Sequence, residues 1–245
     1  MCCSRRRLVK VARASDIAKL IAPPTPADEV MLKFGKIFEE EYSFANYIYR
    51  NAYNLKRVPH LFIRKVAARL REEGIYSREL VVKAYKAYSA LIAAGVVGLK
   101  PKTRFRAYSS IRIAAQPDLR SFGGGTLYEF KLCPIDAYAR VQSSIFAYVW
   151  ESPIKLVGLV EEAGRYRVEM ETIPPPRSLK DLGITPELVA MVAQEQLWCT
   201  KWNEPVYYER CCECESEWSF EEDWEEEWEE EEDWEEWEEE DWEEE

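Results

Sequence analysis

The chain has 245 residues, enough to bury a sizeable core in one large domain or two small ones. Its net charge of −12 combines two opposite parts: residues 216–245 hold 21 acidic residues and no lysine or arginine, whereas the remainder carries all 33 basic and 24 of the 45 acidic residues, a net of +9. A positive body suits a polyanionic partner. The chain has no apolar run long enough for a transmembrane helix and no signal-peptide core, so we predict a cytoplasmic protein without membrane contact.

The N-terminal part of the chain predicts helices. Residues 1–22 form a basic, amphipathic segment that a proline-rich stretch interrupts. Thr25 as a cap, Pro26 in the first turn and the early acid Asp28 then predict a long helix that reaches about Asn51.

Two further helices are expected at 57–71, which is basic, and at 77–97, which Ser77 caps. The second helix interleaves aromatic and basic side chains, an arrangement that can stack nucleic-acid bases and hold phosphates. An ordinary amphipathic helix with solvated lysines is the alternative, and the sequence favours it. The DNA-binding candidates on this helix are Lys83, Lys86, Tyr85 and Tyr88.

Strand signals follow at 107–115 and 126–132, where apolar and polar residues alternate. The glycine-rich residues 121–125 between them predict a turn, because glycine accepts backbone angles that other residues avoid. We therefore expect the two strands to pair as a hairpin, with Asp118 near its turn.

The C-terminal part predicts a helix over 135–150, then a hairpin of strands at 155–160 and 165–173. A last helix is expected to start at Thr185 and reach Trp198. This order of elements fits an α/β protein with a mixed sheet flanked by helices.

Three side chains around the glycine turn form a chemically coherent set. Glu129 and Lys131 are two residues apart on a strand, so both project from one face, which Asp118 can reach across the hairpin. Carboxylate oxygens select hard cations such as Mg²⁺ or Mn²⁺, and a lysine beside them can orient a water or stabilise a developing anion. This combination can hydrolyse a phosphodiester. A solvated, charge-paired strand face and a simple turn are the alternative interpretation.

At these residues the sequence resembles the PD-(D/E)XK nuclease superfamily, and more closely its branch of RecB-like nucleases and CRISPR-associated exonucleases (Cas four). The resemblance implies that Asp118 and Glu129 bind the metal, together with the backbone carbonyl of Phe130, and that Lys131 is the catalytic lysine.

Two weaker matches flank this motif, and the resemblance as a whole covers about residues 31–173. In the first helix Glu39 stands where the branch often carries a histidine, so Glu39 or Glu40 would have to serve as the additional metal ligand. Downstream, Gln142 matches the branch's Gln-x-x-x-Tyr helix, with Phe146 in the tyrosine position, and becomes a further catalytic candidate.

The resemblance implies a restriction-endonuclease-like core at residues 31–177, with a helical insertion at about 57–97 and added N-terminal helices. Outside this core we expect a basic segment at 1–30 and a helix with clustered cysteines at 178–215. The acidic, tryptophan-rich residues 216–245 predict a disordered tail, because such charge density forbids a packed core.

The cysteines outside the core are dense enough to suggest a metal. In the related nucleases one cysteine before the core and three after it bind a [4Fe-4S] cluster, and the same order is available here. Zinc, reduced thiols and disulfides are the alternatives. The candidate ligands are Cys2, Cys3, Cys199, Cys211, Cys212 and Cys214, whereas Cys133 is expected to be a small buried side chain.

The sequence therefore predicts a Mg²⁺- or Mn²⁺-dependent deoxyribonuclease that acts on single-stranded DNA or duplex ends in repair, recombination or CRISPR-type processing. A Holliday-junction resolvase on the same core is a variant of this prediction. A catalytically silent nucleic-acid-binding or scaffold protein is the main alternative, in which the acidic tail recruits a basic protein partner or imitates single-stranded nucleic acid. Mg²⁺-dependent cleavage discriminates between them.

Overall fold

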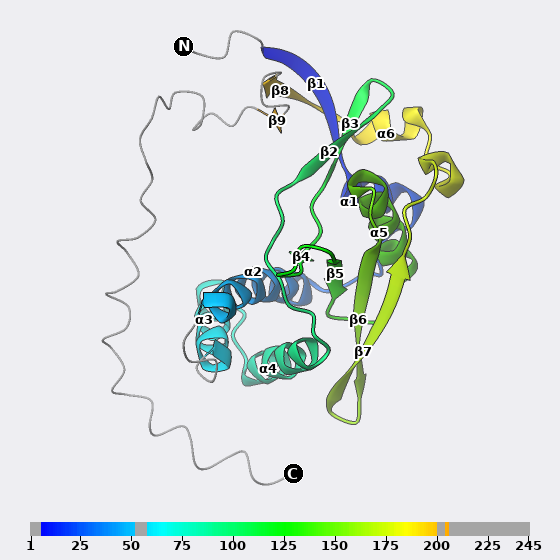
Figure 1. Ribbon diagram of the computed structural model, residues 1–245. Coiled ribbons are helices and arrows are strands. Elements are labelled where there is room, and N and C mark those ends of the chain that lie inside the picture. The colour runs from blue at the N-terminus through cyan, green and yellow to red at the C-terminus, as the bar shows by residue number, and fades with distance from the viewer. Residues whose placement is uncertain (1–5, 52–57, 200–203, 206–245) are drawn as a thin grey trace, which may run out of the picture.

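The computed structural model describes residues 6–51, 58–199 and 204–205, which form an α/β protein with two mixed β-sheets and helices packed against them (Figure 1). The predicted α/β class is confirmed. The predicted tail and five of the seven cysteines (Cys2, Cys3, Cys211, Cys212 and Cys214) lie outside the described residues.

The first sheet joins the two ends of the described chain. Its order is β2-β3-β1-β8-β9, with β1 parallel to β3 and the other pairs antiparallel. The strands are β1 (Arg6–Arg13), β2 (Arg104–Tyr108), β3 (Ile111–Ala115), β8 (Gln194–Cys199) and β9 (Glu204–Pro205).

The second sheet carries the predicted motif. Its order is β4-β5-β6-β7, with β5 and β6 parallel and the outer pairs antiparallel. Parallel neighbours need a crossover connection, and helix α5 supplies it. The strands are β4 (Leu119–Arg120), β5 (Leu127–Lys131), β6 (Ile154–Glu162) and β7 (Arg165–Ile173).

The helices gather in two groups. Helices α2, α3 and α4 lie together beside the four-stranded sheet, whereas α1, α5 and α6 pack near the five-stranded sheet (Figure 1). Helix α5 contacts strands of both sheets and so connects them. The bounds are α1 (Ala14–Ile21), α2 (Glu29–Asn51), α3 (Val58–Glu72), α4 (Arg78–Ala93), α5 (Ala137–Trp150), a 3-10 turn (Leu179–Leu182) and α6 (Pro186–Val192).

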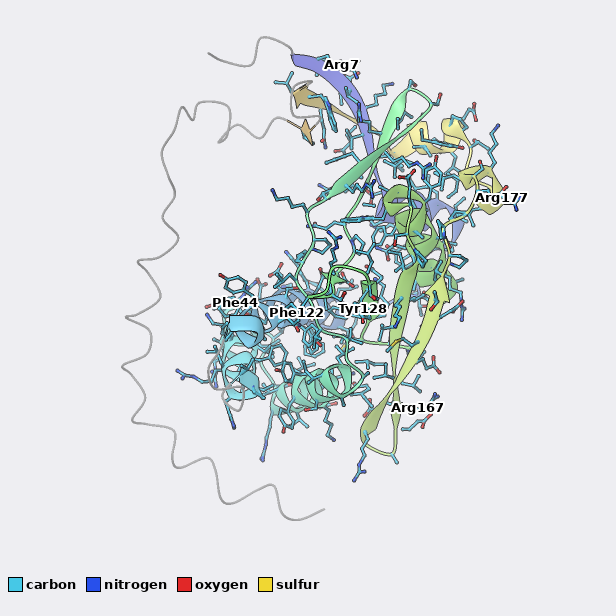
Figure 2. All side chains as sticks on the ribbon, viewed as in Figure 1. Arg7, Phe44, Phe122, Tyr128, Arg167 and Arg177 are labelled. Carbon is cyan, nitrogen blue, oxygen red and sulfur yellow. The ribbon has the colours of Figure 1, made fainter. Side chains whose placement is uncertain are left out.

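An aromatic core fixes the first helix group on β5. Apolar residues of α2 recur at helical spacing and face the sheet, where the Phe38 and Tyr42 rings lie 6.1 and 5.5 Å from the ring of Phe130. Tyr128 of β5 is buried in the same core, into which side chains of α2, α3 and α4 extend (Figure 2). Aromatic packing of this kind holds the back of β5 rigidly in place.

The expected hairpin around the glycine turn was wrong in its first strand. Residues 107–115 are not one strand, because the chain reverses between β2 and β3 at Ser109, where φ is 56°. Strand β3 belongs to the five-stranded sheet, and the antiparallel partner of β5 is instead the short β4 that follows Asp118 directly.

Several helix boundaries also differ from prediction. Helix α2 begins at Glu29, and the Asp28 side chain, rather than Thr25, accepts a hydrogen bond from the Met31 backbone N–H at 2.7 Å. The last helix ends at Val192, since Gln194–Cys199 forms a strand with β1. Likewise, residues 6–13 of the basic N-terminal segment form a strand, which the helix α1 follows.

Candidate functional site

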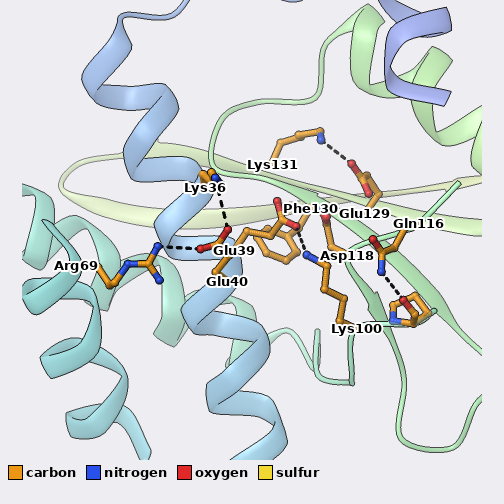
Figure 3. A network of polar contacts seen from close by, with 11 residues as sticks. Lys36, Glu39, Glu40, Arg69, Lys100, Gln116, Asp118, Glu129, Phe130 and Lys131 are labelled. Atoms are coloured by element: carbon orange, nitrogen blue, oxygen red, sulfur yellow. Dashed lines mark hydrogen bonds and ion pairs between the residues drawn. The ribbon is translucent and has the colours of Figure 1, made fainter. Parts of the chain in front are cut away.

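Backbone contacts fix Asp118 at the start of β4. Leu99 and Arg120 exchange two backbone hydrogen bonds of 2.9 and 2.7 Å, and a side chain at Gly98 would overlap the carbonyl oxygen of Arg120. The Gln116 side chain donates to the carbonyl of Pro101 at 2.8 Å (Figure 3). The chain is thus held on both sides of Asp118, which leaves this residue little freedom.

The structure brings Asp118, Glu129 and Lys131 together. Because Leu119 pairs with Tyr128, Asp118 lies across from Glu129, and its Oδ2 accepts a hydrogen bond from the Phe130 backbone N–H at 2.8 Å. The Lys131 Nζ donates to the Glu129 Oε1 at 2.6 Å (Figure 3). Asp118 is 7% and Glu129 2% exposed, so two carboxylates share a buried site with one ammonium.

One carboxylate oxygen of this group lacks a partner. Glu129 Oε2 is buried and accepts no hydrogen bond from any described residue, although buried carboxylate oxygens are normally paired. Burial raises the pKa of the Asp118 carboxyl well above its ordinary value, and the neighbouring Glu129 and Glu39 raise it further, against the opposing effects of Lys131 and the Phe130 N–H. The site is therefore short of positive charge.

The Lys131 ammonium is held by this excess of carboxylates. Burial disfavours its charged form, but Glu129 and Asp118 outweigh burial and raise the pKa of Lys131. Its side chain keeps 25% of its surface exposed, so the ammonium lies between the buried acids and solvent.

The two acids of α2 point to different places. Glu39 bonds to Lys100 Nζ at 3.0 Å and lies near enough to Asp118 to raise the pKa of that carboxyl. Glu40 bonds instead to Arg69 Nη2 at 3.0 Å (Figure 3). Successive helix residues point about 100° apart, so one acid faces the site and the other faces α3.

The donor set fits a hard divalent cation. Asp118 and Glu129 offer carboxylate oxygens on one side of the β4–β5 pair, and the orphaned Oε2 marks where a positive charge would be gained. Among the described residues, no three His, Cys, Asp or Glu side chains stand close enough to hold a metal by themselves. Glu39, whose Oε1 accepts from Lys100, would have to move closer to join them, and the Phe130 carbonyl stays a predicted ligand.

Helix α5 carries the predicted Gln142 and also Tyr138, which sequence reasoning missed. Gln142 is buried, and its Oε1 has no partner among the described residues. Tyr138, one turn earlier, is half-buried, and burial raises the pKa of its hydroxyl. Lys131 lies close enough to lower this pKa, and Glu129 lies close enough to raise it. Its position four residues before Gln142 was the available signal, because both then share one helix face.

The four DNA-binding candidates on α4 do not all lie on its exposed face. Tyr88 was wrongly placed among the DNA-binding residues: it is 4% exposed, and its ring stacks on Phe62 at 4.6 Å. Its spacing from the buried Ala84 puts it on the inner face of the helix. Tyr85 and Lys86 are exposed and Lys83 is half-buried, so these three remain candidates.

The cysteine predictions mostly fall outside the described part of the chain. Cys199 ends β8, so its backbone is placed next to Arg6 of β1. Cys133 was predicted to be buried and is instead an exposed free thiol, because it follows β5 at the surface.

No protein-family model matches the chain, and no curated protein matches it in sequence. Within the described residues, no helix is both long and apolar enough to cross a membrane. The geometry around Asp118, Glu129 and Lys131 is therefore the basis for inferring a function.

Proposed function

We propose that the protein is a metal-dependent nuclease that hydrolyses DNA phosphodiester bonds, with a core like that of the PD-(D/E)XK nucleases and similar in activity to the RecB-like and CRISPR-associated exonucleases. The observation that carries this proposal is the buried Asp118–Glu129 pair, in which Lys131 bonds to Glu129 and one oxygen of Glu129 is orphaned. Buried carboxylates that lack countercharge are typical of metal and catalytic sites.

The arrangement around the pair supports the proposal. The order of α2, the β4–β5 pair, α5 and the parallel strand β6 gives a helix-flanked mixed sheet with the motif on a central strand, as the restriction-endonuclease-like assignment requires. Phe130 and Tyr128 anchor β5 in the aromatic core, so Glu129 and Lys131 project from a rigid support.

Each side chain has a role in this proposal. Asp118 and Glu129 would hold Mg²⁺ or Mn²⁺, which when bound supplies charge neutralisation for the phosphate and an acidified water. Lys131 has three N–H donors, of which Glu129 takes one, so others remain to orient a water or contact a phosphate oxygen. Gln142 and Tyr138 lie on the helix beside this face and are positioning candidates.

The test is cleavage of end-labelled single-stranded and duplex DNA by purified protein with Mg²⁺, with Mn²⁺ and with EDTA. Wild-type protein should cleave only with a divalent cation, and Asp118→Asn and Glu129→Gln should abolish cleavage. Glu171→Gln is the matched control, since Glu171 lies in the same sheet and pairs with Arg140 at 2.9 Å on the surface.

Tight DNA binding without any metal-dependent cleavage would overturn the enzyme proposal in favour of a silent binding protein. Cleavage that survives in Asp118→Asn and Glu129→Gln would show that these carboxylates are not the site.

A further inference from the structure

Two adjoining cavities flank the glycine turn next to the carboxylates. Their volumes are about 350 and 360 Å³, and Arg120 and Gly124 line both of them. We call the two together the turn pocket. Its other principal side chains are Arg104, Trp150, Lys100 and Phe122.

The turn pocket is basic and partly aromatic. Of the described residues that line it, three are cationic and none is acidic. The Arg120 Nε donates to the Gly124 carbonyl at 2.8 Å, which fastens the guanidinium to the turn. Arg104 donates to the Trp150 carbonyl at 2.9 Å, and its guanidinium lies 5.8 Å from the centre of the Trp150 ring. Arg104 also pairs with Glu151 at 3.5 Å, and both arginines are exposed, so the N–H groups that remain can meet a ligand.

The turn pocket also lies beside the proposed metal site. Arg120 is two residues after Asp118, and Leu127, which lines the first cavity, is two residues before Glu129. Two residues span about 7 Å along a strand. Lys100, in the second cavity, is bonded to Glu39, which lies near Asp118.

We propose that the turn pocket binds the nucleotide next to the cleaved bond, with Arg104 and Arg120 contacting its phosphate and the ring of Trp150 or Phe122 stacking on an unpaired base. This proposal rests on the proposed function. Guanidinium groups match phosphate geometry, and a base that stacks on an aromatic ring must be free of its partner strand. The substrate would therefore be single-stranded, or unpaired where it is cut.

The test is the anisotropy of a fluorescein-labelled, mixed-sequence single-stranded oligonucleotide titrated with the full chain in EDTA, where no cleavage occurs. Arg104→Gln should weaken binding about tenfold, and Arg104→Gln/Arg120→Gln further. The slope of log Kd against log salt should fall by about 0.7 for each phosphate that a variant no longer neutralises. Arg167→Gln is the control, since Arg167 is 54% exposed, against 47% for Arg104, and likewise pairs with glutamate.

The two proposals can fail separately in this experiment. If both arginine variants keep the affinity and the salt slope of the wild type, the turn-pocket proposal is overturned, even if Asp118→Asn still abolishes cleavage. If the wild-type protein never cleaves DNA but the arginine variants bind the oligonucleotide more weakly, the turn pocket remains a nucleotide-binding site and the nuclease proposal is overturned. Arg120→Gln removes the bond to Gly124, so Arg104→Gln alone decides the outcome if the double variant unfolds.

Discussion

Two clusters of carboxylates and cations in this protein differ in how the charges are paired. Arg69 bonds to Glu40 at 3.0 Å and to Glu41 at 3.2 Å and lies 3.7 Å from Glu72, so one guanidinium serves all three acids. Lys131 bonds to Glu129 alone, at 2.6 Å, and leaves Asp118 to a backbone N–H. We call the first cluster closed, because each of its carboxylates is paired with the guanidinium. We call the second cluster open, because its Asp118 is bonded to a backbone N–H and to no cation.

The difference follows from the cations and from burial. Arginine carries five donors in a planar fork that can bridge two carboxylates, whereas lysine is a compact point charge. Burial raises the pKa of Glu41 as well, but Arg69 and Lys65 oppose it there. At Asp118 burial and two neighbouring acids raise the pKa, and Lys131 and the Phe130 N–H oppose them. A closed cluster joins α2 to α3, and an open one is ready for a further cation.

The largest expected effect is the loss of cleavage when the open cluster loses its ammonium. Lys131→Ala should lower the rate of DNA cleavage about 10²- to 10⁴-fold, the usual contribution of a positioned catalytic group. DNA affinity in EDTA should change little, because the turn pocket supplies the phosphate contacts. The assay is single-turnover cleavage of labelled DNA, with Arg69→Ala, in the closed cluster, as the comparison. Equal losses in both variants would show that the effect is structural.

A second expected difference is stabilisation by divalent cations. A cation at one hundred times its Kd adds about 2.7 kcal/mol to the free energy of unfolding, or about 5–10 °C in Tm for a chain of this size. We expect this rise with Mg²⁺ or Mn²⁺ in the wild type and not in Asp118→Asn. Scanning calorimetry checks it, with Glu40→Gln as control, because Glu40 is bonded to Arg69 and faces α3. A Tm rise of full size in Asp118→Asn would place the cation elsewhere.

The neighbouring acids of α2 give a smaller and more local test. Glu39→Gln should lower cleavage about tenfold, because it releases Lys100 and removes a negative charge near Asp118. Glu40→Gln should leave cleavage within about twofold and reduce stability by at most about 1 kcal/mol, as for a half-exposed ion pair. Steady-state cleavage rates and urea unfolding measure the two effects. A larger loss of cleavage in Glu40→Gln than in Glu39→Gln would mean that the ion pairs of these two acids do not indicate which of them serves the site.

Sequence reasoning identified the open cluster because its signal is local. The two-residue period puts Glu129 and Lys131 on one face, and the glycine turn returns β5 toward Asp118. Ser77 was likewise confirmed as the cap of α4, with its hydroxyl accepting from the Leu80 N–H at 3.2 Å. The hairpin of β6 and β7 was also predicted correctly, and its turn lies at Ala163 and Gly164.

The elements that were missed depend on distant partners. Residues 194–199 continue a helical pattern in sequence but pair with β1 at the other end of the chain. The reversal at Ser109 lacks the glycine or asparagine that marks most two-residue hairpin turns. Lys100 and Arg69 carry no local signal, since their acidic partners lie 61 and 29 residues away. Closed and open clusters could therefore be told apart only in three dimensions.

The smallest expected effect is on stability and its dependence on pH. Because the folded-state pKa of Asp118 is raised, this residue stabilises the fold only while it is protonated, and that contribution is lost as pH rises through the folded pKa. Asp118→Asn removes the ionisation and keeps an oxygen that can accept from the Phe130 N–H, so it should be more stable than the wild type at neutral pH by about 1 kcal/mol. Below about pH 4, near the ordinary pKa of aspartate, the two proteins should have equal stability. Urea unfolding of both across this pH range in EDTA measures the difference, and Glu40→Gln should show the opposite sign because it only loses an ion pair. A variant that is less stable than the wild type at neutral pH would mean that Lys131 already compensates both carboxylates, and the cluster would then be as closed as the one around Arg69.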